Sequence, residues 1–196
     1  MKYPASVLLT LLLTACSSAP QPTQYYLLKP QADTVATAYV AGKPLLIMAP
    51  VTMDSLLTQG GILYKTSDNE AVVAKQNLWA QSPDSQLTNR IVTGLRASQQ
   101  HYWPVTNMPE LATTQAPTLL VDVQAFNGDY RGEAILSGEW SLIGADGRLL
   151  DSHPFSYREP LASEGYSALV DALSTASDKL ITDLARKLAR GYPSQQ

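Results

Sequence analysis

The chain has 196 residues, with 14 lysines and arginines against 17 aspartates and glutamates, and a formal net charge of -3 at pH 7. No basic stripe is present to neutralise phosphates, which argues against nucleic-acid binding. The single cysteine cannot form an intrachain disulfide, so the hydrophobic core has to hold the fold by itself. A chain of this length is long enough for one domain with such a core.

Residues 1–15 have the pattern of a secretion signal. Lys2 precedes an apolar run over residues 7–13, and two small residues come directly before Cys16. The apolar run is roughly half of the ~20 residues that a membrane-spanning helix needs. We therefore predict a signal peptide that is removed by cleavage before Cys16.

The letters LTAC at residues 13–16 resemble the lipobox of bacterial lipoproteins. This resemblance implies that Cys16 carries diacylglycerol and further acyl chains, and two or more chains anchor a protein stably to a bilayer. Ser17 stands where an aspartate commonly retains lipoproteins in the inner membrane, which implies the outer membrane and its periplasmic face. The alternatives are an ordinary cleaved signal with an incidental cysteine, and a surface-exposed lipoprotein.

Residues 16–24 are the expected lipidated N-terminus and tether, because the stretch after Cys16 is short, uncharged and contains proline. We expect a single domain over residues 25–192. Its first part predicts four strands, which lie at residues 25–28, 44–51, 62–66 and 71–75. The last two flank the turn-forming residues 67–69 and predict a β-hairpin.

A helix is predicted to follow this hairpin. Ser82 is its candidate N-cap and Pro83 suits the first helical position. One apolar face repeats every four residues, at Leu87, Ile91 and Leu95. A short strand is expected near residues 102–105.

Beyond residue 117 the pattern changes to a period of two, which is typical of half-buried strands. We predict strands at residues 118–126, 133–143 and 148–158. Turns are expected at Asn127–Asp129 and at Asp146–Gly147. Three consecutive antiparallel strands follow from this arrangement.

The chain closes with an amphipathic helix, for which Ser163 is the candidate cap and Gly191 the stop signal. The expected element order is therefore ββββαββββα. This order predicts an α/β fold, in which two main helices pack on a mixed, largely antiparallel sheet.

The histidines, serines and carboxylates that could support catalysis do not form a recognised catalytic or metal-binding motif in the sequence. His101 and His153 lack the spacing of a zinc site, and Ser167 lacks the second glycine of a nucleophile elbow. Glu133 and Glu139 share a strand face, which a solvated face explains more simply than an acid–base pair. We therefore predict that the protein is not an enzyme, binds no metal and acts through anchoring and binding.

Several segments, in order and spacing, resemble the PqiC type of lipoprotein, the auxiliary component of MCE (mammalian-cell-entry) lipid-transport systems. They are YYLL, GILYKTSD, NLWAQSPDSQLTNRIVTGL, FNGDYRG and ILSGEW, between residues 25 and 143. The resemblance implies a lipoprotein that docks onto a periplasm-spanning, PqiB-like MCE-domain partner, so that lipids pass between the two membranes. Such partners form rings, and closed symmetric assemblies are common, so a homo-oligomeric ring of this protein is a further expectation.

Tyr130 and Arg131, in the FNGDYRG segment, are the candidate partner-binding residues because tyrosine and arginine are favoured interface anchors. A purely structural turn is an equal alternative for them. Trp140 shares a strand face with Leu136 and Leu142 and is expected in the core. The alternative function is that of a periplasmic lipid-binding carrier, which would act through its own apolar cavity.

Overall fold

The computed structural model describes residues 22–31, 38–39, 41–98, 101–107 and 114–192. The predicted signal peptide, Cys16 and most of the predicted tether lie outside these residues. Within the described ranges, no helix is both long enough and apolar enough to cross a bilayer.

The described elements match the predicted order, with one short strand added before the first helix. They are β1 (Gln24–Tyr26), β2 (Leu45–Met48), β3 (Thr52–Met53), the 3-10 turn η1 (Ser55–Leu57), β4 (Gly61–Lys65), β5 (Ala71–Trp79), α1 (Pro83–Ser98), β6 (Trp103–Thr106), β7 (Thr118–Asp129), β8 (Glu133–Ile143), β9 (Leu149–Pro160) and α2 (Tyr166–Leu188). The addition is β3, whose two residues are too few to leave a periodic pattern in the sequence.

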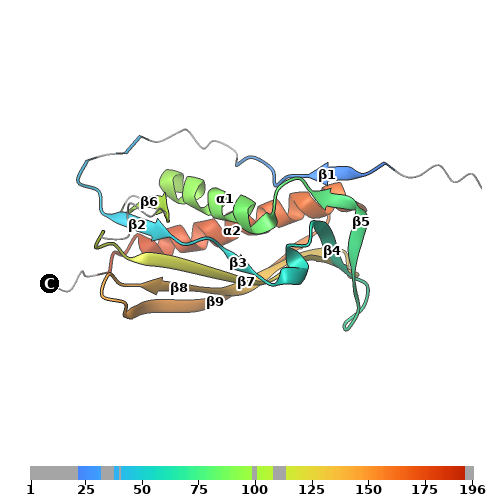
Figure 1. Cartoon of the computed structure of the whole chain (residues 1–196). Helices are drawn as coiled ribbons and strands as arrows, with labels where there is room; N and C mark the ends of the chain where they lie inside the picture. The colour runs from blue at the N-terminus through green and yellow to red at the C-terminus, as the bar shows by residue number, and fades with distance from the viewer. Residues whose placement is uncertain (1–21, 32–37, 40, 99–100, 108–113, 193–196) are drawn as a thin grey trace, which may run out of the picture.

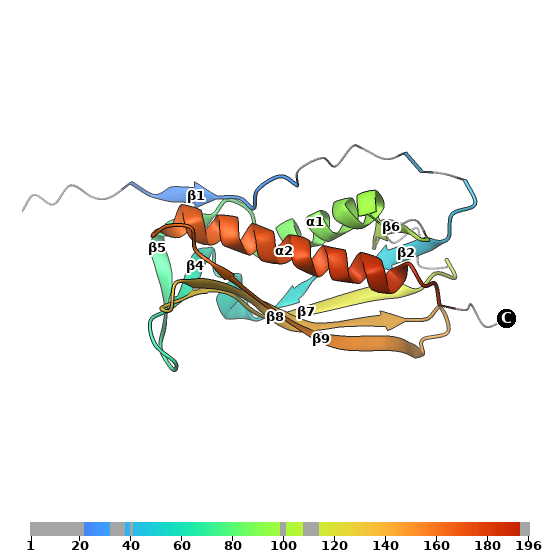
Figure 2. The same ribbon diagram turned by 180° about the vertical axis from the view of Figure 1, so that it is seen from behind.

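The described strands join in one nine-stranded mixed sheet. The long pairings β7–β8 and β8–β9 and the hairpin β4–β5 are antiparallel, as predicted. The remaining pairings are shorter and parallel. Strand β1 pairs with β5, β2 pairs with both β6 and β7, and β3 and β4 each pair with β7. Strands β7, β8 and β9 form a long layer beneath both helices, and β4, β5 and β1 curve up around one end of α2 (Figures 1 and 2).

The core lies between this sheet and the two helices. The predicted stripe Leu87, Ile91 and Leu95 of α1 is fully buried, and Trp140 of β8 is buried as expected. From α2, the most deeply buried side chains include Leu173, Leu180 and Leu184. Each fully buried side chain of this size contributes roughly 1.5–3 kcal/mol of transfer free energy, so this one core can hold the domain together without a disulfide.

The turn predicted at Asn127–Asp129 is wrong. Strand β7 continues through Asp129, and the chain reverses at residues 130–132, where Gly132 has a φ of 79°. The side chains of Asn127 and Asp129 are buried, and the turn starts only at Asp129, whose carbonyl accepts from the amide of Gly132 at 2.9 Å. Asn127 donates to the carbonyl of Gly128 at 2.9 Å, and Asp129 accepts from the amide of Arg131 at 2.9 Å.

The predicted cap of the last helix is also wrong. Helix α2 begins at Tyr166, and its N-cap is Gly165, with a φ of 104° and no side-chain cap bond. Strand β9 runs to Pro160, so residues 161–165 are needed to cross from the sheet layer to the helix layer and Ser163 lies in that crossing. The C-terminal stop is as expected, since Gly191 has a φ of 62° and donates to the carbonyl of Leu188 at 3.2 Å.

The segment after β1 lies across both helices and is held by their side chains. The amide of Leu28 donates to Gln86 of α1 at 2.8 Å, and the amide of Lys29 donates to the hydroxyl of Ser174 of α2 at 3.0 Å. The buried guanidinium of Arg90 donates to the carbonyl of Lys29. The part of the chain that leads to the tether is thus fastened to the helix pair.

Candidate functional site: a tyrosine-rich pocket beside the first strand

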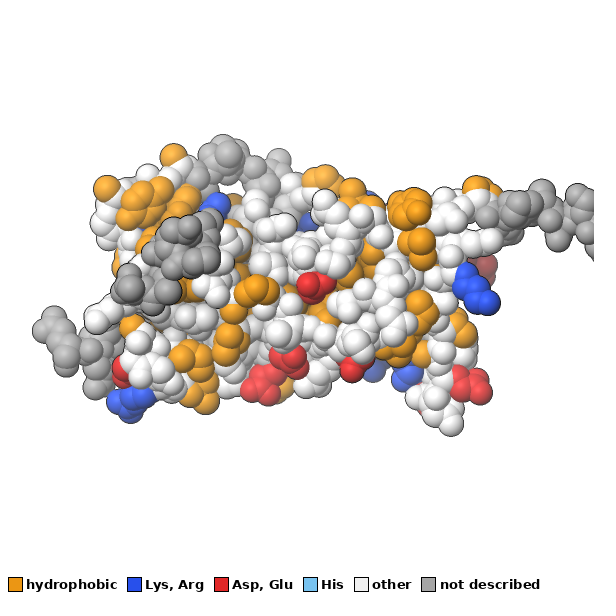
Figure 3. Space-filling view, in the orientation of Figure 1, with side chains coloured by type: hydrophobic (Ala, Val, Ile, Leu, Met, Phe, Trp, Pro, Cys, Tyr) orange, Lys and Arg blue, Asp and Glu red, His pale blue; other side chains and the backbone are white. Residues whose placement is uncertain are grey.

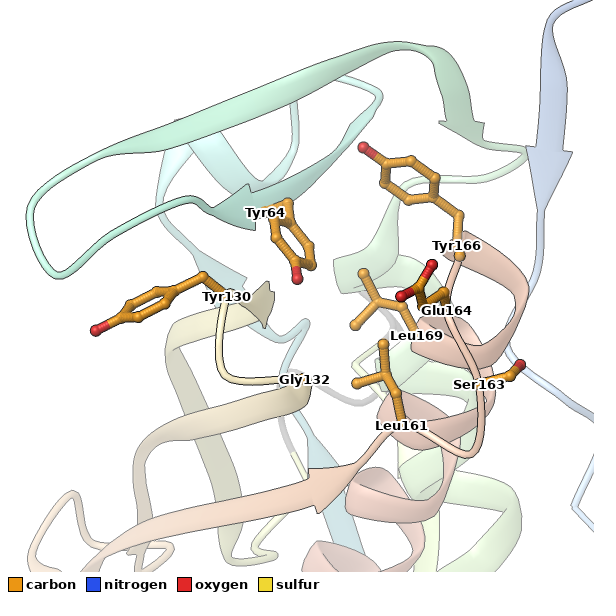
Figure 4. Close-up of a pocket in the computed structure, with 9 residues that line it drawn as sticks. Tyr64, Tyr130, Gly132, Leu161, Ser163, Glu164, Tyr166 and Leu169 are labelled. Carbon is orange, nitrogen blue, oxygen red and sulfur yellow. The ribbon is translucent and has the colours of Figure 1, made fainter.

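An open pocket of about 620 Å³ lies between β4, the β7–β8 turn and the start of α2 (Figure 4). Its volume falls within the range of roughly 300–1,000 Å³ that small-molecule sites occupy. The side chains that line it include Tyr64, Leu161, Glu164, Tyr166 and Leu169. The pocket therefore combines tyrosine rings and leucines with one carboxylate.

Tyr64 enters the pocket because its neighbour on the adjoining strand is a glycine. Tyr64 pairs with Gly128 across β4 and β7. A Cβ atom at Gly128 would lie less than 3.0 Å from the Tyr64 ring and 2.9 Å from a methyl group of Leu169. A glycine inside a strand often marks such a close approach, and here it lets the ring lie against the backbone.

Replacing Gly128 with alanine is expected to displace Tyr64 and to lower the free energy of unfolding by about 1–2 kcal/mol, the cost of mild overpacking. Urea unfolding followed by circular dichroism would measure this loss. Gly144→Ala is the matched control, because the atom nearest to its new Cβ is the flexible end of Asp146 and not a packed ring. Equal stability of the two variants would contradict the packing role assigned to Gly128.

Tyr166 forms the wall of the pocket next to β1. Its ring centroid lies 6.4 Å from that of Tyr26 in β1. Burial raises the pKa of Tyr166 above its ordinary value, and the neighbouring Tyr64 and Tyr26 raise it further, so the hydroxyl stays neutral at physiological pH. Because β1 leads back to the predicted tether, the pocket lies at the end of the domain from which that segment leaves (Figures 1 and 2).

Tyr130 and Arg131 lie in the β7–β8 turn and both contact Asp68, in the turn of the β4–β5 hairpin. The hydroxyl of Tyr130 donates to Asp68 at 2.9 Å, and the guanidinium of Arg131 donates to the same oxygen at 2.6 Å. That guanidinium also lies 4.4 Å from the centroid of the Tyr130 ring. The three side chains form a clamp, the Asp68 clamp, that joins the two turns, and Tyr130 is directed away from the pocket (Figure 4).

The Asp68 clamp is expected to persist in mild acid and to open only in strong acid. The hydrogen bond from Arg131, followed by the one from Tyr130, lowers the pKa of Asp68 below its ordinary value of 3.8. A lowered pKa means that the stabilising contribution is present above pH 3.8 and is lost as the pH falls through the lowered value. Amide exchange in the β4–β5 hairpin should show equal protection factors at pH 7 and pH 5, and lower ones in Asp68→Ala. Equal protection in Asp68→Ala would contradict the clamp.

The residues considered for catalysis do not converge. No group of three or more metal-binding side chains occurs within the described ranges. His153 lies 2.9 Å from Asp151 on β9, whereas the His101 ring stacks edge-on against Tyr102. Glu133 pairs with Arg158 at 3.2 Å, and Glu139 accepts a hydrogen bond from a serine of β9. The two glutamates thus bond to the neighbouring strand, and they do not face each other across a cleft.

Comparison with known proteins shows which protein family the chain resembles. The family model described as the ABC-type transport auxiliary lipoprotein component matches residues 25–185. The chain belongs to this family. The auxiliary lipoprotein is 36% identical to the intermembrane transport lipoprotein PqiC of Escherichia coli (strain K12), over 91% of this chain and 92% of the relative. It is a lipoprotein component of a transport system and not an enzyme, as predicted.

Two solved structures share the fold of the auxiliary lipoprotein. A crystal structure of an uncharacterized protein superposes with a TM-score of 0.73 at 28% identity, covering 86% of this chain and 99% of the other. The crystal structure of a Xanthomonas campestris protein superposes with a TM-score of 0.70 at 20% identity, covering 86% of this chain and 97% of the other. The predicted fold class is thereby confirmed.

The sequence interpretation missed Tyr64, Glu164 and Tyr166 as members of one site. These residues come from β4, the loop before α2 and the first turn of α2, so no local motif contains them. The one available signal was Gly128, which was predicted to lie in a turn but lies in the interior of strand β7. Such a residue indicates close packing, although it does not reveal which side chain approaches.

Proposed function

We propose that this auxiliary lipoprotein is anchored in the outer membrane by acyl chains on Cys16, faces the periplasm and docks onto an MCE-domain protein of an intermembrane lipid-transport system. The observation that carries the proposal is the 36% identity to PqiC, whose name is intermembrane transport lipoprotein, over nearly the full length of both chains. The lipobox-like LTAC stretch and Ser17 support the anchor and the choice of membrane.

Tyr130 and Arg131 are the proposed contact residues for the partner. Tyr130 is 41% exposed, and the side chain of Arg131 is 46% exposed, although both also serve the Asp68 clamp. An aromatic ring with a guanidinium against it is a favoured interface anchor. A ring of several copies of this chain would match the ring symmetry expected of an MCE partner.

The lipid carrier is the second candidate, and the volume of the pocket favours docking over it. A carrier must enclose the acyl chains of its cargo, whereas this pocket is open and holds about 620 Å³. That space suits part of a lipid and not a complete diacyl molecule. Purification of the full-length protein from native membranes should therefore recover a protein partner and not only lipid.

The test is affinity purification of the full-length lipoprotein in mild detergent, with mass spectrometry of the proteins that accompany it. An MCE-domain protein should be recovered with the native chain and lost with Tyr130→Ala/Arg131→Ala. Asp68→Ala is the matched control, because it removes the oxygen that accepts from Tyr130 and Arg131 but keeps both candidate contact residues. Loss of the partner in Asp68→Ala as well would show that the hairpin geometry is required. Recovery of lipid without any partner would favour the carrier.

A further inference from the structure

We infer that the tyrosine-rich pocket binds the ammonium group of a phospholipid headgroup of the phosphatidylethanolamine class. Its lining combines tyrosine rings, two leucines and Glu164, and contains no lysine or arginine. Aromatic faces together with a carboxylate are the usual means by which proteins hold an organic cation. The inference rests on the proposed function for its membrane context.

The charge of the pocket comes from Glu164. Its side chain is exposed at the rim and has no ion pair or hydrogen bond among the described residues. It lies one residue before Gly165, the N-cap of α2, where the positive end of the helix dipole favours a negative charge. This carboxylate is free to accept hydrogen bonds from a cation.

The rings supply the rest of the cation site. Tyr64 is directed into the pocket toward Leu169, and Glu164 lines the same pocket (Figure 4). Tyr166 lines the same space from α2. The hydroxyls of Tyr64 and Tyr166 form no hydrogen bond with the rest of the described chain, so both can bond to a ligand. An ammonium group near these rings would gain cation–π attraction in addition to its bond with Glu164.

The position of the pocket indicates a lipid and not a lysine side chain of a protein. Tyr166 lies against Tyr26 of β1, only ten residues after the proposed lipid anchor at Cys16. At ~3.3 Å per residue those ten residues span at most about 33 Å, so the pocket stays close to the headgroups of the membrane. Leu161 and Leu169 offer apolar contact for the carbon atoms next to a headgroup.

Exposed apolar side chains accompany the pocket at this end of the domain. Tyr25 is 67% exposed and Leu27 is 54% exposed, on and directly after β1 (Figure 3 shows apolar side chains near this strand). Tyrosine is favoured at the boundary between headgroups and acyl chains, where its ring and hydroxyl meet apolar and polar surroundings. The pocket would therefore meet headgroups at the membrane surface.

The test is native mass spectrometry of the full-length lipoprotein, released from nonionic detergent micelles with equal amounts of phosphatidylethanolamine and phosphatidylglycerol of identical acyl chains. The native chain should retain the amine lipid about tenfold more often, the selectivity that one charge-assisted hydrogen bond provides. Glu164→Gln should lower this ratio to near one, and Glu164→Asp should restore part of it. Glu139→Gln, on the outer sheet face, is the matched control.

Equal retention of the two lipids by the native chain would overturn the inference, as would a preference that Glu164→Gln leaves unchanged. A third arm adds N-acetyl-lysine amide. If it binds at Glu164 while phosphatidylethanolamine does not, the ligand is a protein side chain and the lipid assignment is wrong. The failure of this inference is distinguishable from that of the proposed function, because Glu164→Gln should still recover the MCE-domain partner.

Discussion

Cys16→Ala, expressed with a conventional cleavable secretion signal in place of residues 1–15, is expected to release the protein completely from the membrane fraction. The reason is that the proposed acyl chains on Cys16 are the anchor that the sequence predicts. Each buried methylene contributes about 0.8 kcal/mol, so loss of two or more chains removes far more binding energy than surface contacts can restore.

Fractionation of cells, followed by mass spectrometry of the mature N-terminal peptide, would check this result. The native chain should yield a peptide that begins at Cys16 with the added mass of diacylglycerol and an acyl chain. Ser17→Ala, with the native signal, is the control and should remain in the membrane. A Cys16→Ala protein that stays membrane-bound after a high-pH wash would show that another part of the chain binds the bilayer.

Asp178→Ala is expected to lower the free energy of unfolding by about 2–4 kcal/mol. The side chain of Arg90 is only 6% exposed, and its guanidinium donates to both oxygens of Asp178, at 2.8 and 2.9 Å. Removing one partner of a buried pair costs about 3–5 kcal/mol because the other charge is left without compensation. Asp178 is half-exposed, so water replaces part of the lost interaction and the expected cost is lower.

Asp171→Ala is the matched control, because Asp171 lies two turns earlier on the same helix. It pairs with Lys29 at 2.8 Å, but both side chains are well exposed, and such pairs contribute about 0–1 kcal/mol. Urea unfolding of the two variants at equal protein concentration would compare them. If Asp171→Ala lost as much stability as Asp178→Ala, burial of Arg90 would not be the cause.

The side chain of Arg90 also helps to hold the backbone segment that follows β1. Arg90 also donates to the carbonyl of Lys29, so Asp178→Ala should loosen that backbone before the whole domain unfolds. Faster amide exchange at Leu28 and Lys29, whose amides donate to Gln86 and Ser174, would reveal this local effect. The link matters because pulling on a membrane anchor at Cys16 would act first on this segment.

Local patterns predicted most of the elements. The four-residue repeat of Leu87, Ile91 and Leu95 placed α1, since residues at that spacing share one face of a helix wherever it packs. Alternation placed β7 and β8 in the same way. The prediction failed at Asn127 and Gly128, whose residue types favour a turn although both lie inside β7, so that the turn starts only at Asp129.

The Asp68 clamp shows why the function of a residue is harder to predict than its position. Tyr130 and Arg131 lie in a turn, as the sequence indicated, and both are exposed. Their shared contact with Asp68 comes from a hairpin more than sixty residues earlier in the chain. No spacing rule connects these positions, so an interface role and a structural role had equal support before the two turns were seen together.

By itself the sequence determined the signal and lipobox pattern, the helices and strands, and the family resemblance, because each depends on residues close together in the chain. Only the tertiary structure decided that Tyr64, Glu164 and Tyr166 share a pocket beside β1. The physical reason is that β4 pairs with β7 through Gly128 and that residues 161–165 bring α2 back across the sheet. Such pairings depend on the packing of the whole core, to which distant segments contribute together.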